Sequence, residues 1–256
     1  MNLAFVLIST LGAQTVDRSR LIEANTQALQ AQVAGEYAVA ESRLRYAFRV
    51  WAQLRPEERN PADEAVLHGN LAALYAEQQE YSRAWVECRR ALAFHRTPDL
   101  LNGAGIILQG LERYPEAEAA YVESLRKLRP GTYEYARAQF NRATVWAQEG
   151  RKAEALSEME AALPMLEPNP LSYATGLWQA SLLVAPERAR AWLERAQELL
   201  EQNGVGGVNL RRMILEARAA RVGEKKLARR LRAEAKRLRT PPKAGVSVEQ
   251  LRRERY

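Results

Sequence analysis

The stretch from Gly69 to Leu92, GNLAALYAEQQEYSRAWVECRRAL, reads as two amphipathic helices folded back on each other. Apolar residues recur at helical spacing as far as Tyr75, and polar residues 77–80 then interrupt the pattern. A second apolar stripe begins at Ala84. This pattern predicts a helical hairpin, and the same unit recurs along most of the chain.

The recurring mark lies in the second helix of each unit. It is a small residue, an apolar residue four positions later and another small residue three positions beyond that. The triplets are Ala40-Leu44-Ala47, Ala84-Cys88-Ala91, Ala117-Tyr121-Ser124, Ala155-Met159-Ala162 and Ala189-Leu193-Ala196. Successive triplets are 44, 33, 38 and 34 residues apart. Small residues at this spacing let two helices approach closely, while the larger residue fills the gap between neighbouring hairpins.

The Gly69 unit resembles the tetratricopeptide repeat (TPR), which has a period of about 34 residues and a W-x2-L-G-x2-Y…A-x3-F…P pattern. Leu71, Ala72 and Tyr75 stand at the leucine, small-residue and tyrosine positions of that pattern. His68 replaces its tryptophan and Cys88 its phenylalanine. The resemblance implies stacked helical hairpins and a protein-binding scaffold that different members use for different ligands.

Other units depart further from the pattern. Arg142 and Gln27 occupy leucine positions, and Leu177 occupies a small-residue position. The resemblance nevertheless covers residues 18–202, about 70% of the chain. We therefore expect an all-α protein, an α-solenoid of about five TPR-like hairpins within residues 16–202. A basic capping helix pair would follow in residues 203–240, and a flexible basic tail in residues 241–256.

The composition and the absence of known motifs limit the disulfides, metal sites and catalytic sites that the chain can form. The chain has 256 residues and a single cysteine, which excludes an intramolecular disulfide and a zinc site built on thiolates. The only histidines are His68 and His95, and they form no metal-ligand spacing with Cys88. Phosphate-binding loops, nucleophile elbows and H-E-x-x-H helices are absent from the sequence. We expect no metal, no cofactor and no enzymatic activity.

The N-terminus resembles a short secretory signal peptide. Residues 3–11 are uncharged and mostly apolar, and Gly12-Ala13 precede the polar Gln14. Cleavage after Ala13 would make the protein periplasmic or secreted. The alternative is that residues 1–13 form an apolar leading helix over the first repeat, in which case the protein would be cytoplasmic.

In the TPR family the first helices line a concave groove that accepts peptides or partner helices. Carried over by position, the candidate groove residues are Asn25, Gln32, Asn102, Gln109, Arg137, Phe140, Gln148 and Trp178. A row of amides can donate and accept hydrogen bonds to an extended peptide backbone without selecting for charged side chains. The alternative is that these amides only keep an unused surface hydrated.

Positive charge is concentrated at the C-terminal end. Residues 203–256 carry 16 Lys and Arg against 5 Glu, a net charge of +11, so the rest of the chain sums to −4. The candidate anion-facing residues are Lys225, Lys226, Arg229, Arg230, Arg232, Lys236 and Arg237. Leu227, Leu231, Ala235 and Leu238 form the opposite stripe of the same predicted helix.

Two functions follow from these patterns. The first is a non-enzymatic, exported scaffold that binds an unidentified protein or peptide partner through the groove of its first helices. The second is a cytosolic adaptor whose basic C-terminal helix docks on nucleic acid or on an anionic membrane surface. In the first, the basic helix is only a cap that keeps the end of the array soluble.

Overall fold

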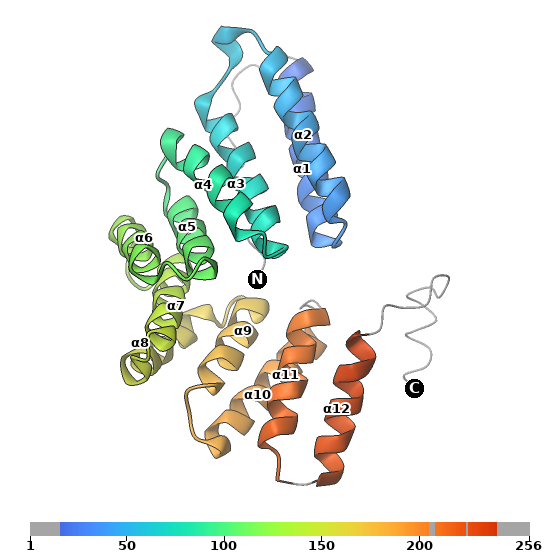
Figure 1. The fold of residues 1–256 in the computed structure, drawn as a ribbon, viewed down its shortest axis with the longest axis vertical. Coiled ribbons are helices and arrows are strands. Elements are labelled where there is room, and N and C mark those ends of the chain that lie inside the picture. Colours follow the sequence, from blue (N-terminus) through green and yellow to red (C-terminus); the bar gives the residue numbers. More distant parts are fainter. Residues whose placement is uncertain (1–15, 205–207, 224, 240–256) are drawn as a thin grey trace. The chain divides into compact units, whose positions relative to one another are not determined.

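The fold is described from a computed structural model, which describes residues 16–204, 208–223 and 225–239. Within these ranges the chain forms 12 α-helices and no strand (Figure 1). The expected all-α class and the α-solenoid of TPR type are confirmed. The chain divides into two compact units, residues 1–165 and 166–256, and each is described by itself. The apolar N-terminal run and residues 241–256 lie outside the described residues.

The first unit consists of four helical hairpins. Their helices are α1 (Val16–Val33) and α2 (Tyr37–Gln53), α3 (Pro61–Glu77) and α4 (Tyr81–Phe94), α5 (Pro98–Gly110) and α6 (Tyr114–Lys127), and α7 (Tyr133–Gln148) and α8 (Lys152–Leu166). A short 3-10 helix, Pro56–Glu58, lies in the loop between α2 and α3. This longer loop accounts for the 44-residue interval between the first two triplets.

The second unit consists of two hairpins. Their helices are α9 (Pro170–Ser181) and α10 (Pro186–Gln202), and α11 (Val208–Arg221) and α12 (Lys225–Arg239). The α11/α12 pair is held by Leu215 and Ala219 of α11 against Leu231 and Ala235 of α12. The expected apolar stripe of the basic helix therefore faces its partner helix.

Side-chain caps fix where several first helices begin. The Asn60 side chain accepts a hydrogen bond from the Ala62 amide at 2.9 Å, and Thr97 Oγ1 accepts one from the Leu100 amide at 3.3 Å. Asn169 does the same for the Ser172 amide at 3.0 Å. In each case proline follows the cap at the first helical position, where its missing N–H costs nothing.

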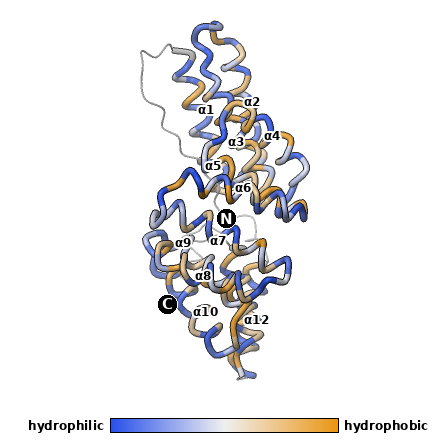
Figure 2. The backbone as a smooth tube through the Cα atoms, turned by 90° about the vertical axis from the view of Figure 1, so that its left-hand side faces the viewer, coloured by the Kyte–Doolittle hydropathy of each residue, from blue (hydrophilic) through white to orange (hydrophobic). Residues whose placement is uncertain are grey.

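The repeated triplets form the centre of the packing. All 15 triplet residues are buried, with at most 2% of their surface exposed. Figure 2 shows how apolar and polar segments alternate along the tube. In the third hairpin Tyr121 is completely buried, and it fits because Gly105 faces it from α5. A Cβ atom added at Gly105 would lie 2.5 Å from the Tyr121 ring.

Gly105→Ala should therefore overpack the third hairpin. The Tyr121 ring is completely buried, so we expect the free energy of unfolding to fall by about 1–3 kcal/mol, measured by urea denaturation. Gly223→Ala is the matched control, because an added Cβ there meets nothing within 4 Å. Equal stability of the two variants would contradict the close approach of α5 and α6.

Candidate functional site

Amide side chains join the first helices of neighbouring hairpins in the first unit. Asn70 on α3 donates from Nδ2 to Oδ1 of Asn25 on α1 at 2.7 Å. Asn141 on α7 donates in the same way to Asn102 on α5 at 3.1 Å. Asn70 is fully buried and Asn102 is 3% exposed. These amides hold the hairpins in register, and a ligand has little access to them.

A third amide contact lies near the C-terminal ends of α5 and α7. Gln109 Nε2 donates to Thr144 Oγ1 at 2.9 Å and to Gln148 Oε1 at 2.8 Å. The buried Tyr121 hydroxyl donates to Gln109 Oε1 at 3.4 Å. Of these residues only Gln148 is exposed. This cluster also links two first helices.

Ion pairs tie the same helices together at their N-terminal ends. Arg18 on α1 lies 3.3 Å from Asp63 at the start of α3. Arg137 on α7 lies 2.5 Å from Asp99 at the start of α5. Each aspartate also stands in the first turn of its helix, where the dipole favours a negative charge. Polar contacts of this kind therefore join α1 to α3 and α5 to α7.

Between α3 and α5 the lining changes to small and apolar residues. A pocket of about 240 Å³ opens there. Its lining residues are Ala62, Ala65, Val66, Gly69, His95, Thr97 and Leu100. A smaller space of about 10 Å³ continues from Gly69 and Leu100 toward Cys88 and Ile107. The pocket exists because α3 presents alanine and glycine at positions where larger side chains would fill it.

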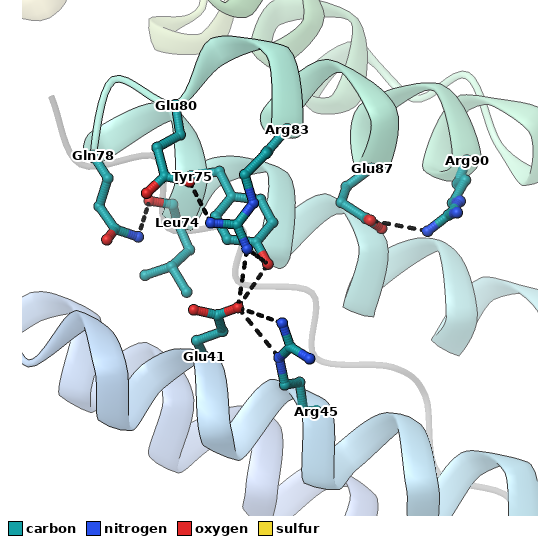
Figure 3. A network of polar contacts seen from close by, with 9 residues as sticks. All are labelled: Glu41, Arg45, Leu74, Tyr75, Gln78, Glu80, Arg83, Glu87 and Arg90. Atoms are coloured by element: carbon teal, nitrogen blue, oxygen red, sulfur yellow. Dashed lines mark hydrogen bonds and ion pairs between the residues drawn. The ribbon is translucent and has the colours of Figure 1, made fainter.

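A charged cluster lies where α2, α3 and α4 meet (Figure 3). Glu41 Oε1 accepts hydrogen bonds from Tyr75 Oη at 2.8 Å and from Arg45 Nη2 at 2.8 Å, and Arg83 Nη2 lies 3.3 Å away. The hydrogen bond from Arg45 lowers the pKa of Glu41. Burial raises the pKa of Tyr75, and the bond to Glu41 adds to this effect. The Arg83 guanidinium also stacks on the Tyr75 ring, 3.9 Å from its centroid. Glu41 on α2 thus holds Tyr75 of α3 and Arg83 of α4 through one oxygen, Oε1, so the cluster locks two hairpins together.

Cys88 has the environment of a core residue. It is 2% exposed, and burial raises the pKa of its thiol to about 12. A thiol with so high a pKa supplies almost no thiolate near neutral pH, and the thiolate is the reactive form. His68 is occupied elsewhere, because its Nδ1 lies 2.7 Å from Glu87 Oε2. In the described part of the chain no cluster of His, Cys, Asp and Glu could hold a metal ion.

In the second unit the seven basic residues predicted to face an anion are all exposed on α12. The opposite side of α12 is covered, since Ala228, Leu231 and Ala235 are 7%, 5% and 2% exposed. None of the seven cations has an acidic partner among the described residues. None of the described helices is both long enough and apolar enough to span a bilayer.

Comparison with known proteins gives a consistent answer on the fold. No family model matches the sequence, and no curated protein matches it either. Solved structures of TPR proteins do match. PilF from Pseudomonas aeruginosa is 21% identical with a TM-score of 0.57, over 94% of this chain and 99% of its own. PilW, a type IV pilus biogenesis factor, is 17% identical with a TM-score of 0.60, over 94% and 100%. The apo form of RapI is 14% identical with a TM-score of 0.57, over 85% and 98%.

The chain has the tetratricopeptide-repeat fold. Identities this low show the TPR fold alone. Within that fold the groove residues expected from position differ in their burial. Phe140 is 3% exposed and Gln32 is 6% exposed, so both side chains are packed inside the array and offer a ligand little surface. Asn102 is buried as well, and its amide oxygen is bonded to Asn141.

The remaining expected groove residues differ in their surroundings. Asn25, Gln109 and Arg137 are half-buried and are bonded to neighbouring TPR helices. Trp178 is half-buried on α9 in the second unit.

The apolar pocket between α3 and α5 was not predicted from the sequence. In the sequence the pocket corresponds to Ala62, Ala65 and Gly69, which recur on one face of α3. Such small residues do not stand out as candidate binding residues.

The pairing of Asn25 with Asn70 can be tested by truncation. Asn25→Ala leaves the fully buried Asn70 amide without its acceptor, so the free energy of unfolding should fall by about 1–3 kcal/mol. Gln30→Ala removes an exposed amide from α1, the helix that carries Asn25, and should cost less than about 0.5 kcal/mol. Urea denaturation followed by circular dichroism measures both. If the two truncations had equal effects, the amides would not be holding the hairpins in register.

Proposed function

We propose that the protein is a non-enzymatic TPR scaffold that binds a protein or peptide partner through the first-helix face of the unit formed by residues 1–165. The observation that supports the proposal is the apolar pocket between α3 and α5. At this pocket the first helices present small and apolar residues to each other, so a partner's side chain has room to enter.

The chemistry of the pocket specifies the ligand. Val66 and Leu100 offer apolar contact, while the Arg18–Asp63 and Arg137–Asp99 ion pairs at the ends of the same helices are bonded within themselves. Recognition therefore depends on burying an apolar side chain more than on hydrogen bonds to amides. A pocket of about 240 Å³ takes one large aliphatic or aromatic side chain of an extended segment.

Val66→Glu places a carboxylate at this pocket and should weaken recognition. Peptides selected from a random library on the unmodified protein should share one large apolar residue. Their affinity for the Val66→Glu variant, measured by fluorescence polarisation, should be lower by about 10–100-fold. This factor corresponds to the free energy gained when one large apolar side chain is buried.

Val86→Glu is the control for this experiment, because Val86 is 39% exposed on the second helix α4 of the same hairpin. It introduces the same charge away from the pocket and should leave the affinity unchanged. Peptides that bind Val66→Glu as tightly as the unmodified protein would contradict a site between α3 and α5. Thermal melts of both variants check that they remain folded.

We also propose that the protein is exported. The support comes from the uncharged, mostly apolar residues 3–11 followed by Gly12-Ala13, the arrangement of a secretory signal. The fold is shared with PilW, described as a type IV pilus biogenesis factor, which is compatible with a role in the cell envelope.

Export predicts a defined mature N-terminus. The intact mass of the protein expressed in its native host should correspond to a chain beginning at Gln14. A leucine-to-arginine change within residues 3–11 should block cleavage, because the apolar run is what the export machinery recognises. Retention of residues 1–13 by the unmodified protein would contradict export and favour a cytoplasmic location.

A further inference from the structure

The arginines of the second unit fall into two groups that differ in their partners. Several arginines of α10 and α11 face carboxylates: Arg190 lies 3.5 Å from Glu187, Arg212 lies 3.4 Å from Glu216, and Arg218 lies 3.1 Å from Glu194. The cations of α12 have no such partner among the described residues. No carboxylate in the described part of the chain therefore compensates their positive charge.

The exposed cations of α12 form two rows. Lys225, Arg229, Arg232 and Lys236 follow the spacing i, i+4, i+7, i+11, which is one stripe of a helix. Lys226, Arg230 and Arg237 form a second stripe beside it. Each row extends for about 16 Å along the helix axis. The only carboxylate on the described part of α12 is Glu234, next to its apolar stripe.

From this arrangement we propose that α12 docks the protein on an anionic lipid bilayer through its two rows of cations. The contact is electrostatic and superficial. A helix that inserts into a bilayer needs a free apolar face, and here Ala228, Leu231 and Ala235 are buried against the rest of the unit. The lysine and arginine side chains instead reach lipid phosphates from above the headgroups.

Nucleic acid presents the same phosphate chemistry and is the competing ligand. Single strands are disfavoured because α11 and α12 carry no aromatic residue on which a base could stack. A duplex offers the same cations phosphates along its backbone and guanine edges in its major groove. The choice of a bilayer over a duplex rests on the proposed export, which separates the protein from nucleic acid.

The test variant removes three charges from one row: Arg229→Gln, Arg232→Gln and Lys236→Gln. All three side chains are exposed, so the thermal melt should not change. The full-length protein should sediment with phosphatidylcholine vesicles that contain phosphatidylglycerol, and not with phosphatidylcholine alone. The triple variant should bind the anionic vesicles at least about 10-fold more weakly, because each cation near the surface contributes to attraction.

A matched control separates α12 from net charge. Arg43→Gln, Arg89→Gln and Lys152→Gln also remove three exposed cations, all from the first unit. This control should bind anionic vesicles within about 2-fold of the unmodified protein. Equal loss in the two triple variants would overturn the assignment to α12, and so would binding to neutral vesicles, which indicates insertion.

Salt and a duplex probe decide between the two phosphate sources. Vesicle binding should weaken as salt rises and remain measurable at about 0.15 M ionic strength, where the Debye length is about 8 Å. A fluorescent DNA duplex should bind more weakly than the vesicles under the same conditions. Tighter binding to the duplex, or no vesicle binding at low salt, would overturn the proposal. Neither result bears on the peptide pocket or on cleavage after Ala13, which are tested separately.

Discussion

The close approach of the two helices in each hairpin is the constraint on which the rest of this structure depends. It is set by the small residues that begin and end each triplet, such as Ala84 and Ala91, which are fully buried. A larger residue at either place would separate the helices and misplace every contact between hairpins. The central residue varies from Cys88 to Tyr121, and the facing helix compensates where necessary, as Gly105 does for Tyr121.

The hairpin turns show how far local sequence determines this geometry. In the first four hairpins a residue with positive φ stands five positions before the first small residue of the triplet. It is Gly35 and Gly150 in the first and fourth, but Gln79 and Glu112 in the second and third. Glycine adopts positive φ readily and so predicts such a turn from the sequence, while glutamine and glutamate do not. There the packed hairpin imposes a conformation that the residue itself disfavours, so the periodic stripes predict the turn and composition does not.

The candidate site was less predictable than the fold for a related reason. Helical spacing identifies which residues share a face, so Asn25, Asn102 and Gln109 could be placed on first helices from the sequence alone. Whether those amides contact a ligand or each other depends on the offset between neighbouring hairpins. The spacing of residues within one helix carries no information about that offset. In the structure the offset brings Asn70 onto Asn25 and Asn141 onto Asn102. The pocket at Gly69 arises in the opposite way, from side chains that are too small to fill the space.

Arginine serves two physical roles in this chain, and the difference explains why net charge alone is a poor guide to its function. Arg83 is placed between Glu41 and the Tyr75 ring, and Arg18 against Asp63, so their charges are compensated where they stand. Such pairs fix the position of one hairpin on the next and add little to the field outside the molecule. None of the seven exposed cations of α12 is paired with an acidic residue in the part of the chain that the structure describes, although the helix itself is held by an apolar stripe. Leu231 and Ala235 hold α12 in place, so its seven exposed cations stay at the surface, where the proposed bilayer contact would use them.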